Sequence, residues 1–253
     1  MSSAARRPRQ PIADVRDRVV SSLSAPARAE VEAECYALWS EFFEGMTRAR
    51  FVETHIFDDT RLVTAYGRDG RLAGFFNLNT QLLDAAGERV LLLGCGVFIR
   101  REYDAYGALL RRGWRSVLRL RLRHPLARFL WQAIYTSPVA YQAMCEGFRV
   151  FYPHPTAPTP AYVTRALAEC CRHRGFVQDE DDPFVVDFSI KQRLIDELKA
   201  SSRLRNPDAN AAYFIERVPA WESGKGLIGI IPVNLVNIAS SARMAIQRRR
   251  RRA

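Results

Sequence analysis

The sequence lacks the residues from which most metal sites and disulfide frameworks are built. It has only five cysteines, an odd number with no C-x-x-C pair, and four histidines without H-x-x-H or H-E-x-x-H spacing. Closely spaced Cys and His residues mark zinc sites, and paired cysteines mark disulfides in secreted domains. No apolar signal sequence precedes the cysteines. We therefore expect no metal and a reducing, cytoplasmic location.

Long hydrophobic runs are also missing. Nowhere do eighteen apolar residues follow one another, so we expect no membrane-spanning helix. Hydrophobic residues nevertheless make up 48% of the 253 residues and aromatic residues 11%, which is enough to bury a full core. The composition excludes a largely disordered chain.

Acidic residues are scarce in particular places. The net charge is +11, from 38 Lys and Arg against 27 Asp and Glu, but eight arginines lie in the first ten and last six residues, and without them the charge is +3. Between Ala105 and Tyr141 there are seven arginines and no acid. A solvated face is the commonest explanation for such charge, but the absence of a balancing acid favours an anionic partner. No DNA or RNA motif accompanies it, so we expect no specific nucleic-acid partner.

The chain divides into three parts by composition. Residues 1–14 are small, basic and proline-bearing, which predicts a flexible lead. Residues 15–190 carry the helix and strand patterns of one α/β domain. Residues 191–253 form a C-terminal extension with a basic tail.

Strand patterns predict a meander near the start of the domain. Arg68-Asp69-Gly70 is a hairpin signal between two β-rich runs, because Asp-Gly tolerates the positive φ of a tight turn. A second turn at residues 86–88 introduces a third strand over residues 90–99. We expect these three strands to be antiparallel.

Helix signals alternate with strand signals in the rest of the chain. Apolar spacing, prolines and glycines give the boundaries of the expected elements. These are a helix after Ser24, a helix over residues 106–123, a strand from Arg128, a short helix opened by Pro138, a strand over residues 148–153, a helix closed by Gly175 and a last strand over residues 227–233.

Two motifs carry a resemblance to a known family. In residues 99–107, Glu102, Tyr103 and Gly107 match the pattern V-x-P-E-Y-R-G-x-G-x-G that follows a strand. In "YQAMCEGFRVFYP", Tyr141 and Gly147-Phe148 match a helix tyrosine followed by Gly-Phe. With the element order over residues 28–152, these motifs resemble the GNAT superfamily of acyl-CoA-dependent acyltransferases.

The resemblance implies a fold and an activity. The fold would be α/β, with a mixed, mainly antiparallel central sheet flanked by helices. The activity would be transfer of an acyl group from a pantetheine thioester to a small-molecule amine. The donor would be acyl-CoA or acyl-phosphopantetheine on an acyl carrier protein.

The resemblance also implies roles for individual residues. Tyr141 would protonate the leaving thiolate, with Tyr135 as a rival acid. Backbone N–H groups at the turn and helix start would face the pyrophosphate. The implied donor-binding residues are Gly94, Cys95, Gly96 and Val97 on the strand, Gly107 in the turn, and Arg111, Arg112 and Arg115 on the helix.

The turn departs from the family pattern. Asp104 replaces the usual cation and would repel a pyrophosphate, while Ala105 and Leu109 replace glycines and are expected to crowd its approach. The three helix arginines could instead hold a phosphate from the side or meet the acidic surface of a carrier protein.

Several signals have structural explanations as well. Gly94 and Gly96 equally indicate a β-bulge or close packing. Tyr141 equally indicates a core aromatic with its hydroxyl bonded to a backbone carbonyl. Glu53 and His55, two residues apart as on one face of a strand, suit a surface pair better than a general base.

The C-terminal residues suggest an alternative function. The apolar residues of 227–245 precede five terminal arginines, so this tail could lie in the interface of an anionic membrane. The alternative to an enzyme is thus a non-catalytic GNAT-like module that docks, as a peripheral membrane protein, on an anionic membrane surface or on an acidic protein.

Overall fold

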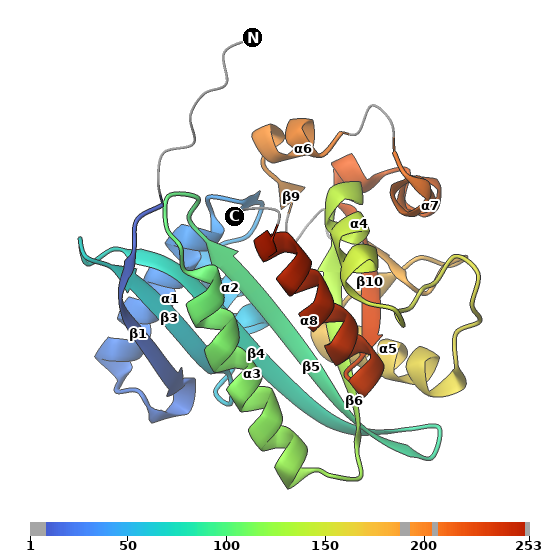
Figure 1. Cartoon of the computed structure of the whole chain (residues 1–253), viewed down its shortest axis with the longest axis horizontal. Helices are drawn as coiled ribbons and strands as arrows, with labels where there is room; N and C mark the ends of the chain where they lie inside the picture. The colour runs from blue at the N-terminus through green and yellow to red at the C-terminus, as the bar shows by residue number, and fades with distance from the viewer. Residues whose placement is uncertain (1–8, 188–192, 204–206, 251–253) are drawn as a thin grey trace. The chain divides into compact units, whose positions relative to one another are not determined.

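The computed structural model describes residues 9–187, 193–203 and 207–250 (Figure 1). The terminal arginines at positions 6, 7, 251 and 252 lie outside this range. The chain forms two compact units. The first unit contains Met1–Glu41, Thr47–Asn79 and Cys95–Arg123, and the second unit contains Phe42–Met46, Thr80–Gly94 and His124–Ala253. Two long strands contribute to both units, and the expected boundary at residue 190 stays a prediction.

Eight strands of the described ranges belong to one hydrogen-bonded sheet. Their order is β1 (Ile12–Val19), β3 (Arg61–Gly67), β4 (Leu72–Ala85), β5 (Glu88–Ile99), β6 (Arg128–Tyr135), β10 (Lys225–Pro232), β8 (Val185–Asp187) and β7 (Val177–Gln178). The pair β5–β6 is parallel, whereas β1–β3, β3–β4, β6–β10, β8–β10 and β7–β8 are antiparallel. A separate pair joins β2 (Phe43–Glu44) to β9 (Arg193–Leu194). The expected mixed, mainly antiparallel sheet is confirmed.

Helices belong to both units. The first unit has α1 (Ala25–Trp39), α2 (Arg48–His55) and α3 (Tyr106–Arg123). The second unit has α4 (Pro138–Gly147), α5 (Ala161–Arg174), α6 (Asp196–Ser202), α7 (Ala209–Arg217) and α8 (Leu235–Arg250). In the part of the chain that the structure describes, no helix combines the length and apolarity needed to cross a membrane.

In the first unit, α3 covers one face of the sheet and α2 the other (Figure 1). Alternation along β4 explains this, because successive side chains of a strand point to opposite faces. The Phe76 ring lies 2.8 Å from the Cβ position of Gly113, so only a glycine lets α3 approach this closely. Its neighbour Phe75 packs edge to face on Phe51 of α2.

Local signals placed several element boundaries correctly. The helix over residues 106–123 is α3, and Pro138 opens α4, where the Ser137 hydroxyl accepts a hydrogen bond from the Ala140 N–H. Gly175 closes α5 with φ of 60°, in the left-handed region that suits glycine. Ala86 and Gly87 also have positive φ, as a tight β4–β5 turn requires.

Other expectations were wrong. Residues 12–14, expected in the flexible lead, begin β1, an edge strand whose charged side chains hide the apolar alternation. The strand expected over residues 148–153 is reduced to one bridge between Tyr152 and Ile230. Glu53 and His55 lie on α2 rather than on a strand, and Glu53 pairs with Arg50 at 2.9 Å.

Candidate functional site

The first unit contains the strand, turn and helix that the sequence singled out. Strand β5 ends at Ile99, the β5–α3 turn spans residues 100–105, and α3 follows. Arg100 anchors this turn, because its N–H donates to the Ala73 carbonyl at 2.9 Å and its Nε contacts Glu41 Oε1 at 2.7 Å. The turn is therefore held to the body of the first unit.

Tyr103 fixes the turn to the β3–β4 hairpin. Its ring is buried, and its hydroxyl donates to Asp69 Oδ2 at 2.6 Å. This hydrogen bond lowers the pKa of Asp69 and raises the pKa of Tyr103. The Cβ position of Gly67 lies 2.5 Å from the Tyr103 ring, so the hairpin needs a glycine there. The matched tyrosine of the motif thus has a structural role.

The N-terminal segment forms backbone hydrogen bonds with the turn. The Asp104 N–H donates to the Gln10 carbonyl at 3.0 Å, and the Gln10 N–H donates to the Glu102 carbonyl at 2.7 Å. Helix geometry leaves the first N–H groups of α3, at residues 106–108, without an acceptor inside the helix. Nothing lies within 4 Å of the Cβ position of Gly107. The space beside Gly107 is therefore open, whereas the Asp104 N–H already has an acceptor.

The expected crowding of the turn was wrong. Ala105 and Leu109, which replace glycines of the pattern, are fully buried. Leu109 points into the core, where its Cδ1 lies 3.1 Å from the Cβ position of Gly74. Asp104 is exposed, so its charge rather than steric bulk opposes a phosphate at this turn.

The outer surface of α3 is basic and partly apolar. Arg111, Arg112 and Arg115 are all exposed. Beside them, Trp114, Leu118 and Leu122 follow one another at intervals of four residues with exposed fractions of 44%, 61% and 75%. Side chains spaced in this way form one stripe along a helix. The arginines border an apolar stripe that the sheet does not cover.

Gly96, also in the first unit, is required by close packing. The Asn77 Oδ1 lies 2.5 Å and Phe98 Cε2 2.9 Å from the Cβ position of Gly96. Asn77 is buried and donates from Nδ2 to the His55 carbonyl at 3.0 Å, but its Oδ1 finds no donor within the described ranges. On either side, Cys95 is half-buried and Val97 is 36% exposed.

Gly94 lies in the second unit, where the parallel ladder ends. The ladder pairs residues 90–94 of β5 with residues 128–132 of β6, and β6 continues to Tyr135. Arg174 Nη2 occupies the Cβ position of Gly94, so close approach rather than a bulge explains this glycine. The buried Gln132 Oε1 lies 3.6 Å from the same position and has no donor among the residues described.

Tyr141 is a core residue of the second unit. It is fully buried, and its hydroxyl donates to the Pro153 carbonyl at 3.1 Å. Its ring stacks on Tyr213 and packs against Phe214. Burial raises its pKa. This is the structural alternative that the sequence left open for Tyr141.

Tyr135 differs from Tyr141 in the hydrogen bonding of its hydroxyl. It lies at the end of β6, beyond the ladder, and is 7% exposed. In the described part of the chain, its hydroxyl makes no hydrogen bond, and its ring packs edge to face on Tyr141 at 5.8 Å. Burial raises its pKa well above the ordinary value. Tyr135 therefore stays protonated at neutral pH, and no group of the described residues is bonded to its hydroxyl.

The sheet has the arrangement that the sequence motifs implied. A meander leads into β5, β5 pairs in parallel with β6 over its first half only, and its second half leads through the turn into α3. The chain has a divergent GNAT-like fold. Within this fold, the implied donor-binding residues lie on β5, in the β5–α3 turn and on α3, and the two candidate acids lie on β6 and α4.

Several solved structures are similar to this chain, all at low sequence identity. A GCN5-related N-acetyltransferase from Kribbella flavida matches at 14% identity and a TM-score of 0.37, over 58% of this chain and 92% of its own. An acyl-CoA N-acyltransferase from Pseudomonas aeruginosa matches at 17% identity and 0.32, over 66% and 89%. A conserved protein from Enterococcus faecalis matches at 16% identity and 0.35, over 53% of this chain and only 32% of its own. No protein-family model and no curated protein sequence matches the chain.

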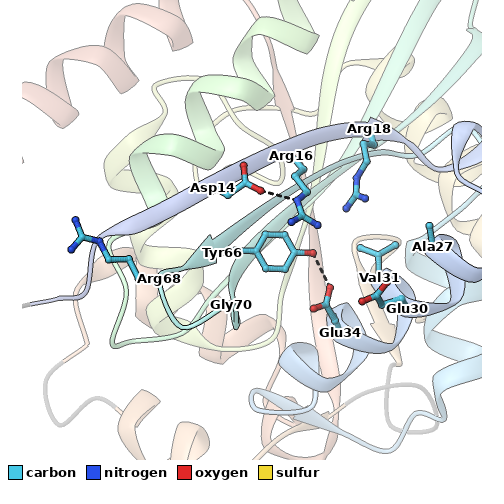
Figure 2. Close-up of a pocket in the computed structure, with 11 residues that line it drawn as sticks. Asp14, Arg16, Arg18, Ala27, Glu30, Val31, Glu34, Tyr66, Arg68 and Gly70 are labelled. Atoms are coloured by element: carbon cyan, nitrogen blue, oxygen red, sulfur yellow. Dashed lines mark hydrogen bonds and ion pairs between the residues drawn. The ribbon is translucent and has the colours of Figure 1, made fainter.

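The first unit also contains a cavity that the sequence did not indicate. It has a volume of about 300 Å³ and lies between β1, α1 and the β3–β4 hairpin (Figure 2). Its charged residues are scattered in the sequence without a motif, so no local pattern could reveal them. No group of three or more His, Cys, Asp or Glu side chains suited to a metal occurs among the residues that the structure describes.

Proposed function

We propose that this protein is an acyltransferase that moves an acyl group from a pantetheine thioester to a small-molecule amine. The observation that carries the proposal is the open start of α3 next to β5. There the N–H groups of residues 106–108 point out of the helix, no atom blocks Gly107, and Arg111 and Arg112 follow in the next turn. This combination suits a phosphorylated arm that lies along β5.

The proposed chemistry is a direct attack of the amine on the thioester. Binding both reactants side by side removes most of the entropic cost of their encounter. A backbone N–H of β5 near Val97 polarises the thioester carbonyl and stabilises the negative charge that develops on its oxygen. Of the two tyrosines that the resemblance implies as acids, Tyr135 is our candidate to protonate the thiolate as the C–S bond breaks, because its hydroxyl is protonated and bonded to no other group of the described chain. The proton that the attacking nitrogen loses when the amide forms restores the tyrosine.

The basic surface of α3 suggests how the donor is held. Asp104 and the Gln10 hydrogen bond weaken the turn as a pyrophosphate site, so Arg111, Arg112 and Arg115 take a larger share of the binding. Free CoA offers them phosphates, and an acyl carrier protein offers an acidic surface around its pantetheine arm. We propose both as donors and expect the carrier-linked donor to gain more from these arginines.

Thiol release tests the proposal. Acetyl-CoA, a long-chain acyl-CoA and a carrier protein whose pantetheine thiol is acylated would each be incubated with the protein and a mixture of primary amines. We expect thiol release that depends on amine, and a rise of about tenfold in the donor KM for Arg112→Glu, equivalent to about 1.4 kcal/mol. Arg119→Glu, at another exposed position farther along α3, is the matched control. Absence of amine-dependent release with all three donors would contradict the proposal.

A second candidate function is docking on an anionic membrane, and the exposed stripe of α3 favours it. Helices that lie in a membrane interface combine large apolar side chains with arginines or lysines. Trp114, Leu118 and Leu122 supply the apolar part, and the bordering arginines supply the charge. The stripe is a better candidate than the C-terminal tail that the sequence suggested.

The tail is packed against its own unit. Asn237 of α8 is buried, and the Met244 Cε lies 3.2 Å from the Cβ position of Gly147 on α4. Leu235, Val236 and Ile238 remain exposed at the start of α8. Insertion of the whole tail into a membrane would therefore require α8 to leave α4, whereas the α3 stripe needs no rearrangement within its unit.

Liposome sedimentation distinguishes the docking function from a soluble one. We expect the protein to pellet with vesicles that contain phosphatidylserine and not with neutral vesicles, and added salt to weaken binding without abolishing it. The double variant Leu118→Asn and Leu122→Asn should remain mostly in the supernatant. Leu126→Asn, with an exposed fraction of 92% outside α3, is the control and should still pellet. Equal pelleting of both variants would exclude the stripe.

A further inference from the structure

The cavity between β1 and α1 has walls of opposite charge. Arg16 and Arg18 extend from β1, whereas Glu30 and Glu34 extend from α1 on the other side (Figure 2). Ala27 and Val31 of α1 add a small apolar surface. The volume of about 300 Å³ is at the lower end of the range for small-molecule sites.

Arg16 and Glu34 already have hydrogen-bond partners among the residues that line the cavity. Arg16 Nε contacts Asp14 Oδ2 at 2.7 Å, and the Tyr66 hydroxyl donates to Glu34 Oε2 at 2.8 Å. The Arg16 guanidinium also lies 4.5 Å from the centre of the Tyr66 ring. Burial and the bond to Glu34 raise the pKa of Tyr66 to about 12. These contacts hold Arg16, Tyr66 and Glu34 in place.

Arg18 is not satisfied in the same way. Its side chain is half-buried and points from β1 toward α1 (Figure 2). Its Nη2 lies 3.4 Å from Thr64 Oγ1, and its Nε is buried with no acceptor among the described residues. A guanidinium has five N–H donors and is costly to bury without an anion. Arg18 also forms no ion pair in the described ranges, and neither does Glu30 across the cavity.

We propose that this cavity binds a small zwitterion, a free amino acid with an apolar side chain. Its carboxylate pairs with Arg18, its ammonium group lies near Glu30 and Glu34, and its side chain packs on Ala27 and Val31. A simple anion would be repelled by the two glutamates, and a simple cation would be repelled by the two arginines. Only a ligand with both charges satisfies both walls. The proposal does not depend on acyl transfer.

Three matched probes test the charge requirement in the full chain. Saturation-transfer NMR and calorimetric titration would be carried out with L-leucine, with isoamylamine, which lacks the carboxylate, and with 4-methylpentanoate, which lacks the amine. We expect L-leucine to bind at least tenfold more tightly than either of the other two. The proposal would be overturned if either single-charge probe bound as tightly as L-leucine. It would also be overturned if L-leucine showed no binding at 10 mM, a concentration about ten times a weak Kd of about 1 mM.

Variants test the residues. Arg18→Gln should weaken L-leucine binding at least tenfold, and Glu30→Gln, at an exposed position where folding is not at risk, should weaken it several-fold. Arg50→Gln on α2, which does not line the cavity, is the control and should bind normally. Unchanged binding in both cavity variants would overturn the proposal. Because the readout is binding of L-leucine, a failure here is separate from a failure to release thiol.

Discussion

Tyr135→Phe should lower turnover with an amine acceptor by about 10²-fold, the usual effect of losing a general acid. The hydroxyl of Tyr135 is the only group removed, and it bonds to no other residue of the described chain. Folding should therefore be preserved. Steady-state kinetics with the best donor from the thiol-release assay would measure kcat and KM, and a loss in kcat with little change in KM would indicate a role in the chemical step.

Tyr141→Phe is the matched control for this change. It removes the donor from the buried Pro153 carbonyl, so we expect a loss of about 1 kcal/mol in the free energy of unfolding and less than about twofold in turnover. If Tyr141→Phe instead causes the large loss of turnover, the general acid is Tyr141, the residue that the motif indicated. If neither variant loses turnover, the proposed acid step is wrong.

Asn237→Ala should lower the free energy of unfolding by about 3 kcal/mol or more. The change leaves several backbone groups without their partner, and each such group costs about 1–3 kcal/mol when it is buried. Asn237 is 2% exposed and makes four hydrogen bonds that tie α8 to its unit. Its Oδ1 accepts from the N–H groups of Arg149 and Val150, and its Nδ2 donates to the carbonyls of Val150 and Pro232. Urea unfolding followed by circular dichroism would measure the loss.

Asn234→Ala provides the comparison for Asn237→Ala. Asn234 is exposed, and its Oδ1 accepts a hydrogen bond from the Asn237 N–H at 2.9 Å as a helix cap. Loss of such a cap costs about 1 kcal/mol. A loss for Asn237→Ala no larger than for Asn234→Ala would show that α8 is not held by the buried amide. The expected result also means that removal of residues 234–253 damages the fold and is no clean test of membrane binding.

Elements with local signals could be predicted from the sequence almost to the residue. The boundaries of α3 and α4 follow from Pro125 and Pro138, and the end of α5 follows from Gly175, because each residue restricts its own backbone or that of its neighbour. Strand β1 could not be predicted in this way. Its register depends on pairing with β3, and its own residues alternate poorly between apolar and charged.

The candidate site could be predicted only in part for the same reason. The motif gave the location of the turn, but the sequence left open whether Gly94 and Gly96 mark a bulge, close packing or donor binding. It could not show that Arg174 and Asn77 are the side chains that require them, because these partners come from α5 and β4. It also ranked Tyr141 above Tyr135, because the sequence does not show that the chain after α4 folds back and places the Pro153 carbonyl at the Tyr141 hydroxyl.

The bridge between Gln10 and Tyr103 affects how the protein should be produced. Trimming the chain to begin at β1 would remove the acceptor of the Asp104 N–H and the donor to the Glu102 carbonyl. The released Asp104 N–H would then be available to a phosphate oxygen, so a trimmed protein would bind nucleotide donors through a different set of groups. Donor affinities are therefore comparable only between preparations that keep Gln10, and a fused purification tag should be separated from it by a flexible linker.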